Sequence, residues 1–219
     1  MPLYLDSFDL DAWDRLMPTG LFKGITTNPL LAKRAGHSYA AISWPDMFAR
    51  AANLGAQELH VQVPDCNPDQ IDFAREIKWL GDSYQVTAVC KIPLTEPGVR
   101  LARSVIGAEI PVLMTACYHA KQMYVAQSLG AQFIAPYYGR MDEAKIDARA
   151  HLAHMRAIGQ GHAEPCEILV ASLRSVDQML ELSADGHATF TISPQIAEQL
   201  LSDDLTLAAV DEFESAARE

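Results

Sequence analysis

The sequence predicts a single (β/α)8 barrel, and three observations support this fold. Short apolar runs alternate with longer amphipathic stretches eight times within about 200 residues, as expected of parallel strands joined by helices. No low-complexity linker or shift of composition divides the 219 residues. Polar side chains collect just after the apolar runs, where the loops of a barrel build its site. The alternative is a doubly wound open sheet, but no G-x-G-x-x-G or G-x-x-x-x-G-K-[ST] motif follows an early strand.

Each expected strand is a nearly uninterrupted apolar run, as in a sheet that is covered on both faces. The strands are Leu3–Leu5, Gly24–Thr27, Leu59–Val63, Val86–Ile92, Pro111–Met114, Phe133–Pro136, Ile168–Ala171 and Ala188–Ile192. The helices are Asp9–Met17, Tyr39–Asn53, Pro68–Leu80, Pro97–Ile106, Ala120–Leu129, Asp142–Ile158, Val176–Ala184 and Pro194–Leu201.

The segment Leu205–Glu219 remains after the eighth strand and helix, with apolar residues at roughly helical spacing. We therefore divide the chain into a barrel of residues 1–203 and an extra C-terminal helix of residues 204–219. This helix packs either across the base of its own barrel or on a neighbouring subunit.

The composition excludes several classes of partner. The net charge of −11 argues against nucleic acid and anionic membranes. No apolar run is long enough to span a bilayer, and residues 1–10 lack the organisation of a signal peptide, so we expect a cytoplasmic protein. Four scattered cysteines without a C-x-x-C pair indicate reduced, packed thiols. His151, His154 and His162 have a spacing that could bind a metal, but the charged segment around them favours a solvated helix face, so we expect no metal.

Lys91 is the anomaly of the fourth expected strand, because it interrupts the apolar run from Val86 to Leu94. Burial lowers the pKa of a lysine, and a shift from about 10.4 to roughly 7–8 costs about 3–5 kcal/mol. Such a cost is tolerated where a neutral amine serves as a nucleophile. The alternative is a lysine at the end of a strand that extends its ammonium to water past Pro93. The strand alone leaves both interpretations open.

Seven of the eight expected strands carry a polar side chain at the C-terminal end, the rim where barrel active sites lie. A structural role is available to each: Asp6 can cap a helix, and Asn28 followed by Pro29 is a good helix start. Their collection on one rim together with a lysine favours a functional site. The polar residues are Asp6, Thr26 with Thr27 and Asn28, Gln62, Lys91, Thr115, Tyr137 with Arg140, and Ser172 with Arg174.

This set of residue types suits covalent catalysis through a Schiff base. A neutral amine attacks a ketone, and the iminium that forms lets an adjacent carbon–carbon bond break. Asp6 or Tyr137 can move the proton, and Asn28 can bind substrate hydroxyls. Arg140 and Arg174, with Ser172, can bind a phosphate at the far end, because the guanidinium fork matches phosphate oxygens.

Motifs in the same order along nearly the whole chain resemble the small transaldolase and fructose-6-phosphate aldolase family. They are Tyr4-Leu5-Asp6, Gly24-Ile25-Thr26-Thr27-Asn28-Pro29, Lys91-Ile92-Pro93-Leu94-Thr95, Thr115-Ala116 with Tyr118, Ala135-Pro136-Tyr137, Gly139-Arg140 and Ala171-Ser172-Leu173-Arg174.

The resemblance implies a class I aldolase without a cofactor, in which Lys91 forms a Schiff base with a dihydroxyacetone unit. By the same resemblance Asp6 and Asn28, with Thr27 beside them, orient the hydroxyls of the covalent intermediate. Gln62, Thr115 and Tyr137 then hold the catalytic water or relay its proton. Arg140, Ser172 and Arg174 match phosphate-binding positions. Family members of this kind commonly form decamers of two pentameric rings, so a homo-oligomer, decamer or pentamer, is expected.

Two activities compete within this family. Transaldolases pass the three-carbon unit to an aldose phosphate and typically have glutamate, serine and phenylalanine where this chain has Gln62, Ala135 and Tyr137. These three positions resemble the aldolase type, which releases free dihydroxyacetone, so we expect an aldolase with transaldolase as the alternative. The run Met141–Lys145 lacks the glycine that the family's loop usually has here, so the resemblance does not predict the outer wall of the phosphate site or the length of the phosphosugar. The tail after Phe213 is short, which weakens the expectation of a decamer.

Two further classes of protein remain as alternatives to a Schiff-base enzyme. A metal-dependent aldolase or isomerase would lose activity in a chelator, but none of the strand ends supplies a histidine ligand. A non-catalytic assembly protein would keep its oligomeric state without turnover, and it would have no physical reason to retain this set of strand-end groups.

Overall fold

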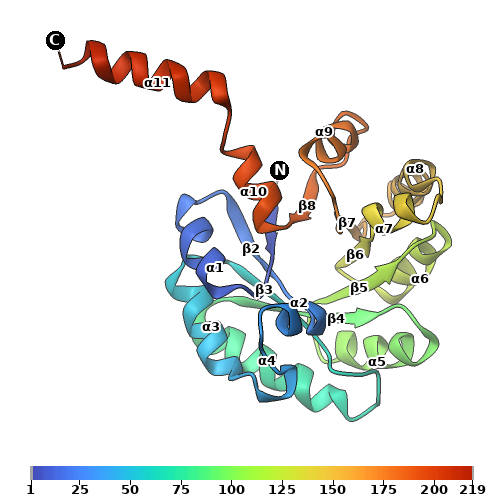
Figure 1. The fold of residues 1–219 in the computed structure, drawn as a ribbon. Coiled ribbons are helices and arrows are strands. Elements are labelled where there is room, and N and C mark those ends of the chain that lie inside the picture. Colours follow the sequence, from blue (N-terminus) through green and yellow to red (C-terminus); the bar gives the residue numbers. More distant parts are fainter. Residues whose placement is uncertain (1, 219) are drawn as a thin grey trace.

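Eight parallel strands close into a barrel in the computed structural model, which describes residues 2–218 (Figure 1). Each strand pairs with the next in sequence, and the first pairs with the eighth. The predicted (β/α)8 fold is therefore confirmed. The strands are β1 (Leu3–Asp6), β2 (Phe22–Thr26), β3 (Glu58–Gln62), β4 (Thr87–Pro93), β5 (Val112–Cys117), β6 (Phe133–Pro136), β7 (Glu167–Val170) and β8 (Thr189–Ile192).

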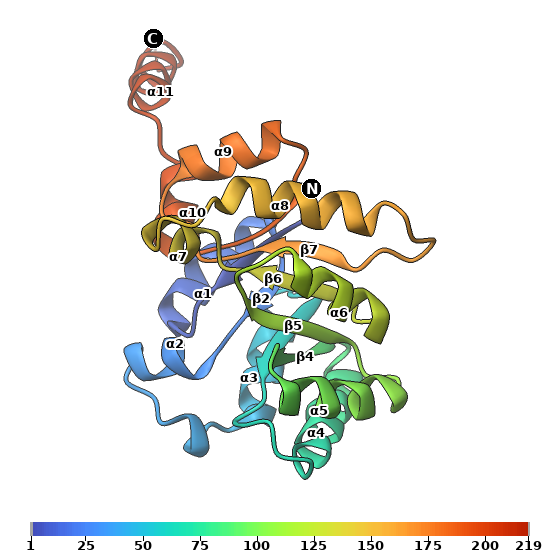
Figure 2. The same ribbon diagram turned by 90° about the vertical axis from the view of Figure 1, so that its right-hand side faces the viewer.

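The helices surround the barrel, and most connect one strand to the next (Figures 1 and 2). They are α1 (Leu10–Leu16), α2 (Pro29–Arg34), α3 (Trp44–Asn53), α4 (Gln70–Tyr84), α5 (Glu96–Gly107), α6 (Lys121–Leu129), α7 (Tyr138–Glu143), α8 (Ala148–Gly159), α9 (Val176–Ala184), α10 (Pro194–Leu200) and α11 (Asp204–Ala216). Two short 3₁₀ helices cover Met17–Thr19 and Tyr39–Ala41. None of the helices in residues 2–218 has the length and apolar character needed to cross a membrane.

Two predicted helices are wrong in their extent. The helix expected over Tyr39–Asn53 begins only at Trp44, after Ser43, because Pro45 occupies the first turn, where its fixed φ suits a helix start. The helix expected over Asp142–Ile158 is divided: α7 ends at Glu143, Lys145 has a φ of 58°, and α8 begins after the cap Asp147. Asn28 and Pro29 begin α2, a helix that the predicted list lacks.

The strands have two separate layers of core. The larger layer packs between the sheet and the helices, with Trp13, Phe48 and Ile77 fully buried. A smaller cluster fills the inside of the barrel and includes Leu113 and Leu169. The inner cluster forms a packed, apolar base for the groups at the C-terminal ends of the strands.

A polar cluster lies within the barrel beside this inner layer. The buried carboxylate of Glu58 accepts hydrogen bonds from Tyr4 Oη at 2.8 Å and from His60 Nε2 at 2.9 Å, and it pairs with Lys23 Nζ at 2.6 Å. Burial alone would raise the pKa of Glu58, but the hydrogen bonds from His60, Lys23 and Tyr4 outweigh burial and lower the pKa to about 2. The rings of Tyr4 and His60 also pack on Phe133. These contacts hold β1, β2, β3 and β6 together at the N-terminal half of the barrel.

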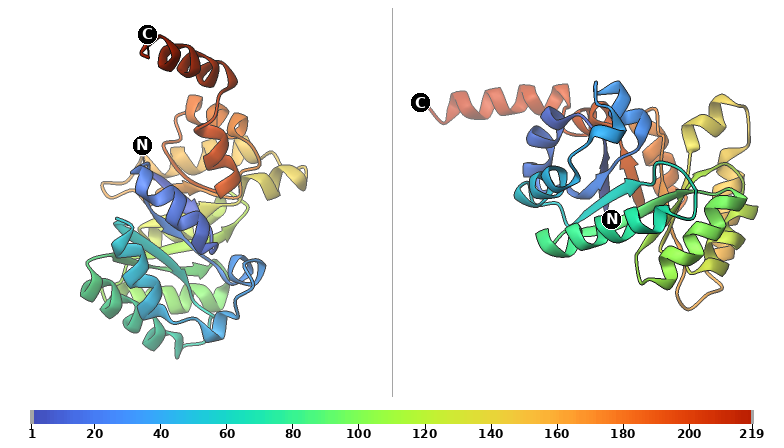
Figure 3. Two further views of the ribbon diagram at one scale, coloured as in Figure 1. Left: turned by 60° about the vertical axis from the view of Figure 1, so that its left-hand side comes forward. Right: turned by 90° about the horizontal axis from the view of Figure 1, so that it is seen from below.

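The last helix, α11, extends away from the barrel (Figures 1 and 3). It begins at the cap Asp203 and contains no buried residue. Its largest side chains lie in solvent: Leu205 is 82% exposed and Phe213 is 70% exposed. The surplus C-terminal helix is therefore present, and it does not cover the base of its own barrel.

Candidate active site

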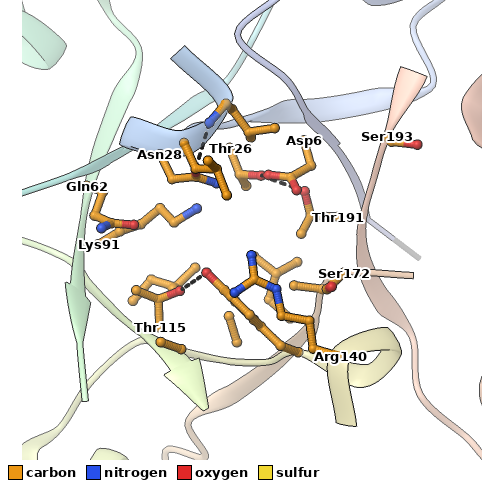
Figure 4. Close-up of a pocket in the computed structure, with 18 of the residues that line it drawn as sticks. Asp6, Thr26, Asn28, Gln62, Lys91, Thr115, Arg140, Ser172, Thr191 and Ser193 are labelled. Carbon is orange, nitrogen blue, oxygen red and sulfur yellow. Dashed lines mark hydrogen bonds between the residues drawn. The ribbon is translucent and has the colours of Figure 1, made fainter. Parts of the chain in front are cut away.

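A cavity of about 660 Å³ opens at the C-terminal end of the barrel, and all eight strands contribute to its lining. Figure 4 shows the polar side chains of the strand ends pointing toward one another around this space. Leu113, Ala135 and Leu169 form apolar parts of the lining. The cavity thus combines an apolar base with a polar rim, as is common for small-molecule sites.

Lys91 reaches into this cavity from β4 (Figure 4). The residue is only 4% exposed and lies between Gln62 of β3 and Leu113 of β5 in the sheet register. Burial lowers the pKa of Lys91, and the negative charge of Asp6 opposes that effect. The alternative of a lysine that extends to water is therefore wrong, and the amine is biased toward the neutral, nucleophilic form.

Asp6 is held in place by the hydroxyl of Thr26, which is in turn hydrogen-bonded to Thr191. Thr26 Oγ1 lies 2.8 Å from Asp6 Oδ1 and donates to it, and Thr26 Oγ1 is 2.6 Å from Thr191 Oγ1. The chain of bonds crosses from β2 to β1 and β8, which fixes the carboxylate on the side of the cavity that faces Lys91 (Figure 4). A carboxylate in this position can orient hydroxyls or accept a proton.

A second hydroxyl pair lies on the opposite wall. Thr115 Oγ1 and Tyr137 Oη are 2.9 Å apart. Burial raises the pKa of Tyr137, so that the phenol keeps its proton at neutral pH. The guanidinium of Arg140 stacks 5.0 Å from the centre of the Tyr137 ring. The pair can hold a water molecule or pass a proton along it.

Asn28 and Gln62 supply amides to the rim. Asn28 Oδ1 caps α2 by accepting from the backbone N–H of Leu31 at 2.9 Å, which leaves the Asn28 amide nitrogen to donate. Gln62 lies beside Lys91 in the β3–β4 register. Both amides are positioned by regular structure rather than by flexible loops.

Two arginines form the far end of the cavity. Arg140 lies in α7, and Arg174 and Ser172 follow β7. Gly139 permits the close approach of these segments, because a Cβ there would lie 2.1 Å from the carbonyl oxygen of Ser172. Arg140 Nη1 contacts Tyr118 Oη at 3.4 Å, whereas Arg174 Nε pairs with Glu143 Oε1 at 2.6 Å.

Ten of the eleven predicted site residues line the cavity. The prediction for Thr27 is wrong: its buried hydroxyl donates to the carbonyl oxygen of His60 at 2.9 Å and faces away from the cavity. Thr26 takes this place, because successive side chains of a strand point to opposite faces. The ten residues that line the cavity are Asp6, Asn28, Gln62, Lys91, Thr115, Ala135, Tyr137, Arg140, Ser172 and Arg174.

Four other polar residues that line the cavity were not predicted from the sequence. Thr191 and Ser193 come from the eighth strand and the loop after it, and Arg34 comes from α2. The alternation Thr189-Phe190-Thr191 could have indicated that hydroxyls of β8 share the inner face. Glu143 is the fourth, and no pattern in the sequence assigns it to the cavity.

Comparison with known proteins identifies the family of this chain. Residues 3–219 match the sequence profile of the family described as "Transaldolase/Fructose-6-phosphate aldolase". The chain belongs to this family. Family membership makes it a transaldolase- or aldolase-type enzyme and does not separate the two activities.

The curated relatives agree with this placement. A "Probable transaldolase" of Jannaschia sp. (strain CCS1) is 28% identical over 213 residues, which cover 97% of this chain and 94% of the relative. A "Probable transaldolase" of Hyphomonas neptunium (strain ATCC 15444) is 28% identical over 214 residues, with 97% and 95% covered. The native KDPGal structure has a TM-score of 0.58 at 15% identity, covers 88% of this chain and 82% of that chain, and shows the shared fold alone.

No group of three or more histidine, cysteine, aspartate or glutamate side chains within residues 2–218 is arranged to hold a metal ion. The four cysteines are free thiols, and burial raises the pKa of the Cys90 and Cys166 thiols to about 12.

Proposed function

We propose that this enzyme is a class I aldolase of the fructose-6-phosphate aldolase type. It cleaves a ketose or ketose phosphate reversibly to free dihydroxyacetone and an aldose, such as glyceraldehyde 3-phosphate. The observation that carries the proposal is Lys91, a buried lysine with a lowered pKa in the barrel cavity. Asp6 faces it on one side, and the Thr115–Tyr137 pair lies on the other.

The proposed reaction begins when the neutral Nζ of Lys91 attacks the ketone carbon of the sugar. Loss of water gives an iminium ion. The bond between the third and fourth carbons then breaks, its electrons pass into the iminium to form an enamine, and the fourth-carbon hydroxyl loses its proton as the aldehyde forms. Protonation of the enamine and hydrolysis of the resulting iminium release dihydroxyacetone and the free lysine.

We assign the proton transfers to a water held by Gln62, Thr115 and Tyr137. A protonated phenol can donate to this water and accept from it, as general acid–base catalysis requires. Asp6 and the amide nitrogen of Asn28 bind the hydroxyls of the three-carbon unit that stays on the lysine. Ala135 leaves room beside Tyr137 for the water.

Transaldolase activity is the alternative, and the names of the curated relatives favour it. In that reaction the enamine attacks a second aldose phosphate instead of being protonated. We prefer the aldolase, because a phenol at position 137 can polarise the water that a phenyl ring could not.

Turnover without an acceptor tests this choice. With fructose 6-phosphate as the sole sugar, an aldolase releases many equivalents of dihydroxyacetone per active site. A transaldolase releases about one equivalent of glyceraldehyde 3-phosphate and almost no dihydroxyacetone, because its three-carbon unit stays on the enzyme. A coupled assay for dihydroxyacetone over hundreds of minutes, with and without an added aldose phosphate, measures the difference.

Arg140 is proposed as the main phosphate contact, since none of the ion pairs within residues 2–218 includes it. Arg140→Ala is expected to lower kcat/KM for fructose 6-phosphate by roughly 10–100-fold and to lower it less for unphosphorylated fructose, because a charge-assisted hydrogen bond contributes about 1.5–3 kcal/mol. Steady-state kinetics on both ketoses measure this. Equal losses on the two ketoses would remove the phosphate role.

We also propose a homo-oligomer in which residues 204–219 form a docking helix for a neighbouring subunit of the 1–203 barrel. The exposed apolar side chains of α11 support this, because a helix with no buried face gains stability only from a partner. Light scattering is expected to give a mass of five or ten subunits for the full chain and a smaller mass for a chain that ends at residue 203. An unchanged mass would assign the assembly to another surface.

A further inference from the structure

Arg174 at the far end of the cavity already has an anionic partner. Its Nε lies 2.6 Å from Glu143 Oε1, and its Nη1 donates to the carbonyl oxygen of Ser172 at 3.2 Å. Both Arg174 and Glu143 line the cavity. The side chains are 47% and 59% exposed, so the pair lies at the mouth, where an incoming sugar would meet it.

The backbone on both sides of this ion pair is fixed. Gly139 N–H donates to the carbonyl oxygen of Ser172 at 3.1 Å, which joins the start of α7 to the loop after β7. Gln178 Oε1 accepts from the backbone N–H of Arg174 at 2.9 Å, and Gln178 Nε2 lies 3.3 Å from Asp142 Oδ2. Glu143 is the last residue of α7, so these contacts hold its carboxylate next to Arg174.

The ion pair changes the charge that a substrate meets. The hydrogen bond from Arg174 lowers the pKa of Glu143, so the carboxylate is ionised at neutral pH. The two arginines would offer a charge of +2, and Glu143 reduces it to +1. A phosphate dianion that binds Arg174 has to share the guanidinium with the Glu143 carboxylate or displace it, and in either case it stays beside a like charge. A substrate that ends in a hydroxyl has neither penalty.

We infer that Glu143 is a specificity-determining residue that biases the cavity toward sugars whose far end carries a free hydroxyl, and against sugars that carry a phosphate there. The inference rests on the proposed aldolase function, because it names the substrate class of the same cavity. Arg140 still attracts a phosphate, so the bias is a matter of degree. Since the pair is half exposed and screened by water, we expect an effect of about tenfold.

The test compares two acceptor aldehydes with dihydroxyacetone as the common donor. The aldehydes are D-glyceraldehyde and D-glyceraldehyde 3-phosphate, and the measured quantity is the ratio of their kcat/KM values. Glu143→Gln removes the charge and keeps the size of the side chain, and it is expected to raise the ratio about tenfold in favour of the phosphate. Asp142→Asn is the matched control, because it removes the same charge one residue away from Glu143 and keeps an oxygen that can accept from Gln178 Nε2. Its ratio should stay within about twofold of wild type.

The affinity for inorganic phosphate, measured by calorimetry, tests the role of Glu143 without any turnover. Glu143→Gln is expected to bind phosphate about tenfold more tightly than wild type, and Asp142→Asn should match wild type. An unchanged or lower ratio and affinity in Glu143→Gln, or an equal gain in Asp142→Asn, would overturn the role of Glu143. Absence of any aldol product in the wild type would instead overturn the proposed function, and phosphate binding would then decide the role of Glu143 alone.

Discussion

Lys91→Met is expected to lower aldol turnover by at least a thousandfold while the protein stays folded. Methionine matches the length of the lysine side chain but has no amine, and no other lysine lines the cavity within residues 2–218. Without the nucleophile there is no Schiff base, so binding alone contributes little to the rate. Cleavage assays on a ketose, together with circular dichroism of the variant, measure both properties. Turnover above about a thousandth of wild type would indicate another mechanism.

The same substitution is expected to stabilise the protein. A buried lysine whose pKa is lowered in the fold disfavours folding when it must be charged, and methionine removes that penalty. We expect a gain of about 0.5–2 kcal/mol in the free energy of unfolding at neutral pH, as is typical when a functional but unfavourable group is replaced.

The pH dependence of this gain has a defined sign. Between the lowered pKa of folded Lys91 and the ordinary value near 10.4, the unfolded chain binds more protons than the folded one, so wild-type stability rises with pH through that window. The advantage of Lys91→Met should therefore be largest at the lower pH and shrink as the pH approaches about 10. Urea unfolding of both proteins at several pH values measures it. A stability gain that stays constant across these pH values would show that the gain does not arise from the ionisation of Lys91.

Tyr137→Phe is expected to lower the release of free dihydroxyacetone by roughly 10²-fold and to lower transfer between sugars by much less. The variant loses the hydroxyl that pairs with Thr115 at 2.9 Å, and with it the proposed proton path to the enamine and the water. Transfer needs no protonation of the enamine, because a second aldehyde takes its electrons.

Tyr138→Phe is the matched control for this experiment. It makes the same chemical change one residue further along, at a side chain that does not line the cavity. The partition between release and transfer, measured by quantifying both products in one reaction, should be that of the wild type in Tyr138→Phe and should move toward transfer in Tyr137→Phe. An unchanged partition in Tyr137→Phe would favour the transaldolase alternative.

The barrel was predictable because its signals are local and repeated. Buried parallel strands such as β4 need apolar residues on both faces, and that demand is visible as a run along the sequence. Helix boundaries were less predictable where a cap and a proline compete with an apolar pattern, as at Ser43 and Pro45. The direction in which α11 leaves the barrel has no local signal at all, because it depends on surfaces outside its own segment.

The part of the candidate site that was predictable from the sequence consists of residues at the C-terminal ends of strands. Lys91 was identified by its conflict with an apolar run, and the structure brings Asp6 and Tyr137 around it from strands far apart in the sequence. Thr26 and Thr27 are adjacent, and only the register decides which one faces inward. Glu143 and Arg174 are 31 positions apart, and the pairing depends on the close approach at Gly139, which no spacing rule describes.

The most direct test of the central claim is borohydride trapping followed by peptide mass spectrometry. The protein is treated with borohydride in the presence of dihydroxyacetone or fructose 6-phosphate, and Lys91→Met is treated in parallel. We expect a reduced three-carbon adduct on the peptide that contains Lys91, after treatment with either sugar, and none in the variant. An absent adduct with both sugars, or an adduct at a different lysine that persists in Lys91→Met, would contradict the account.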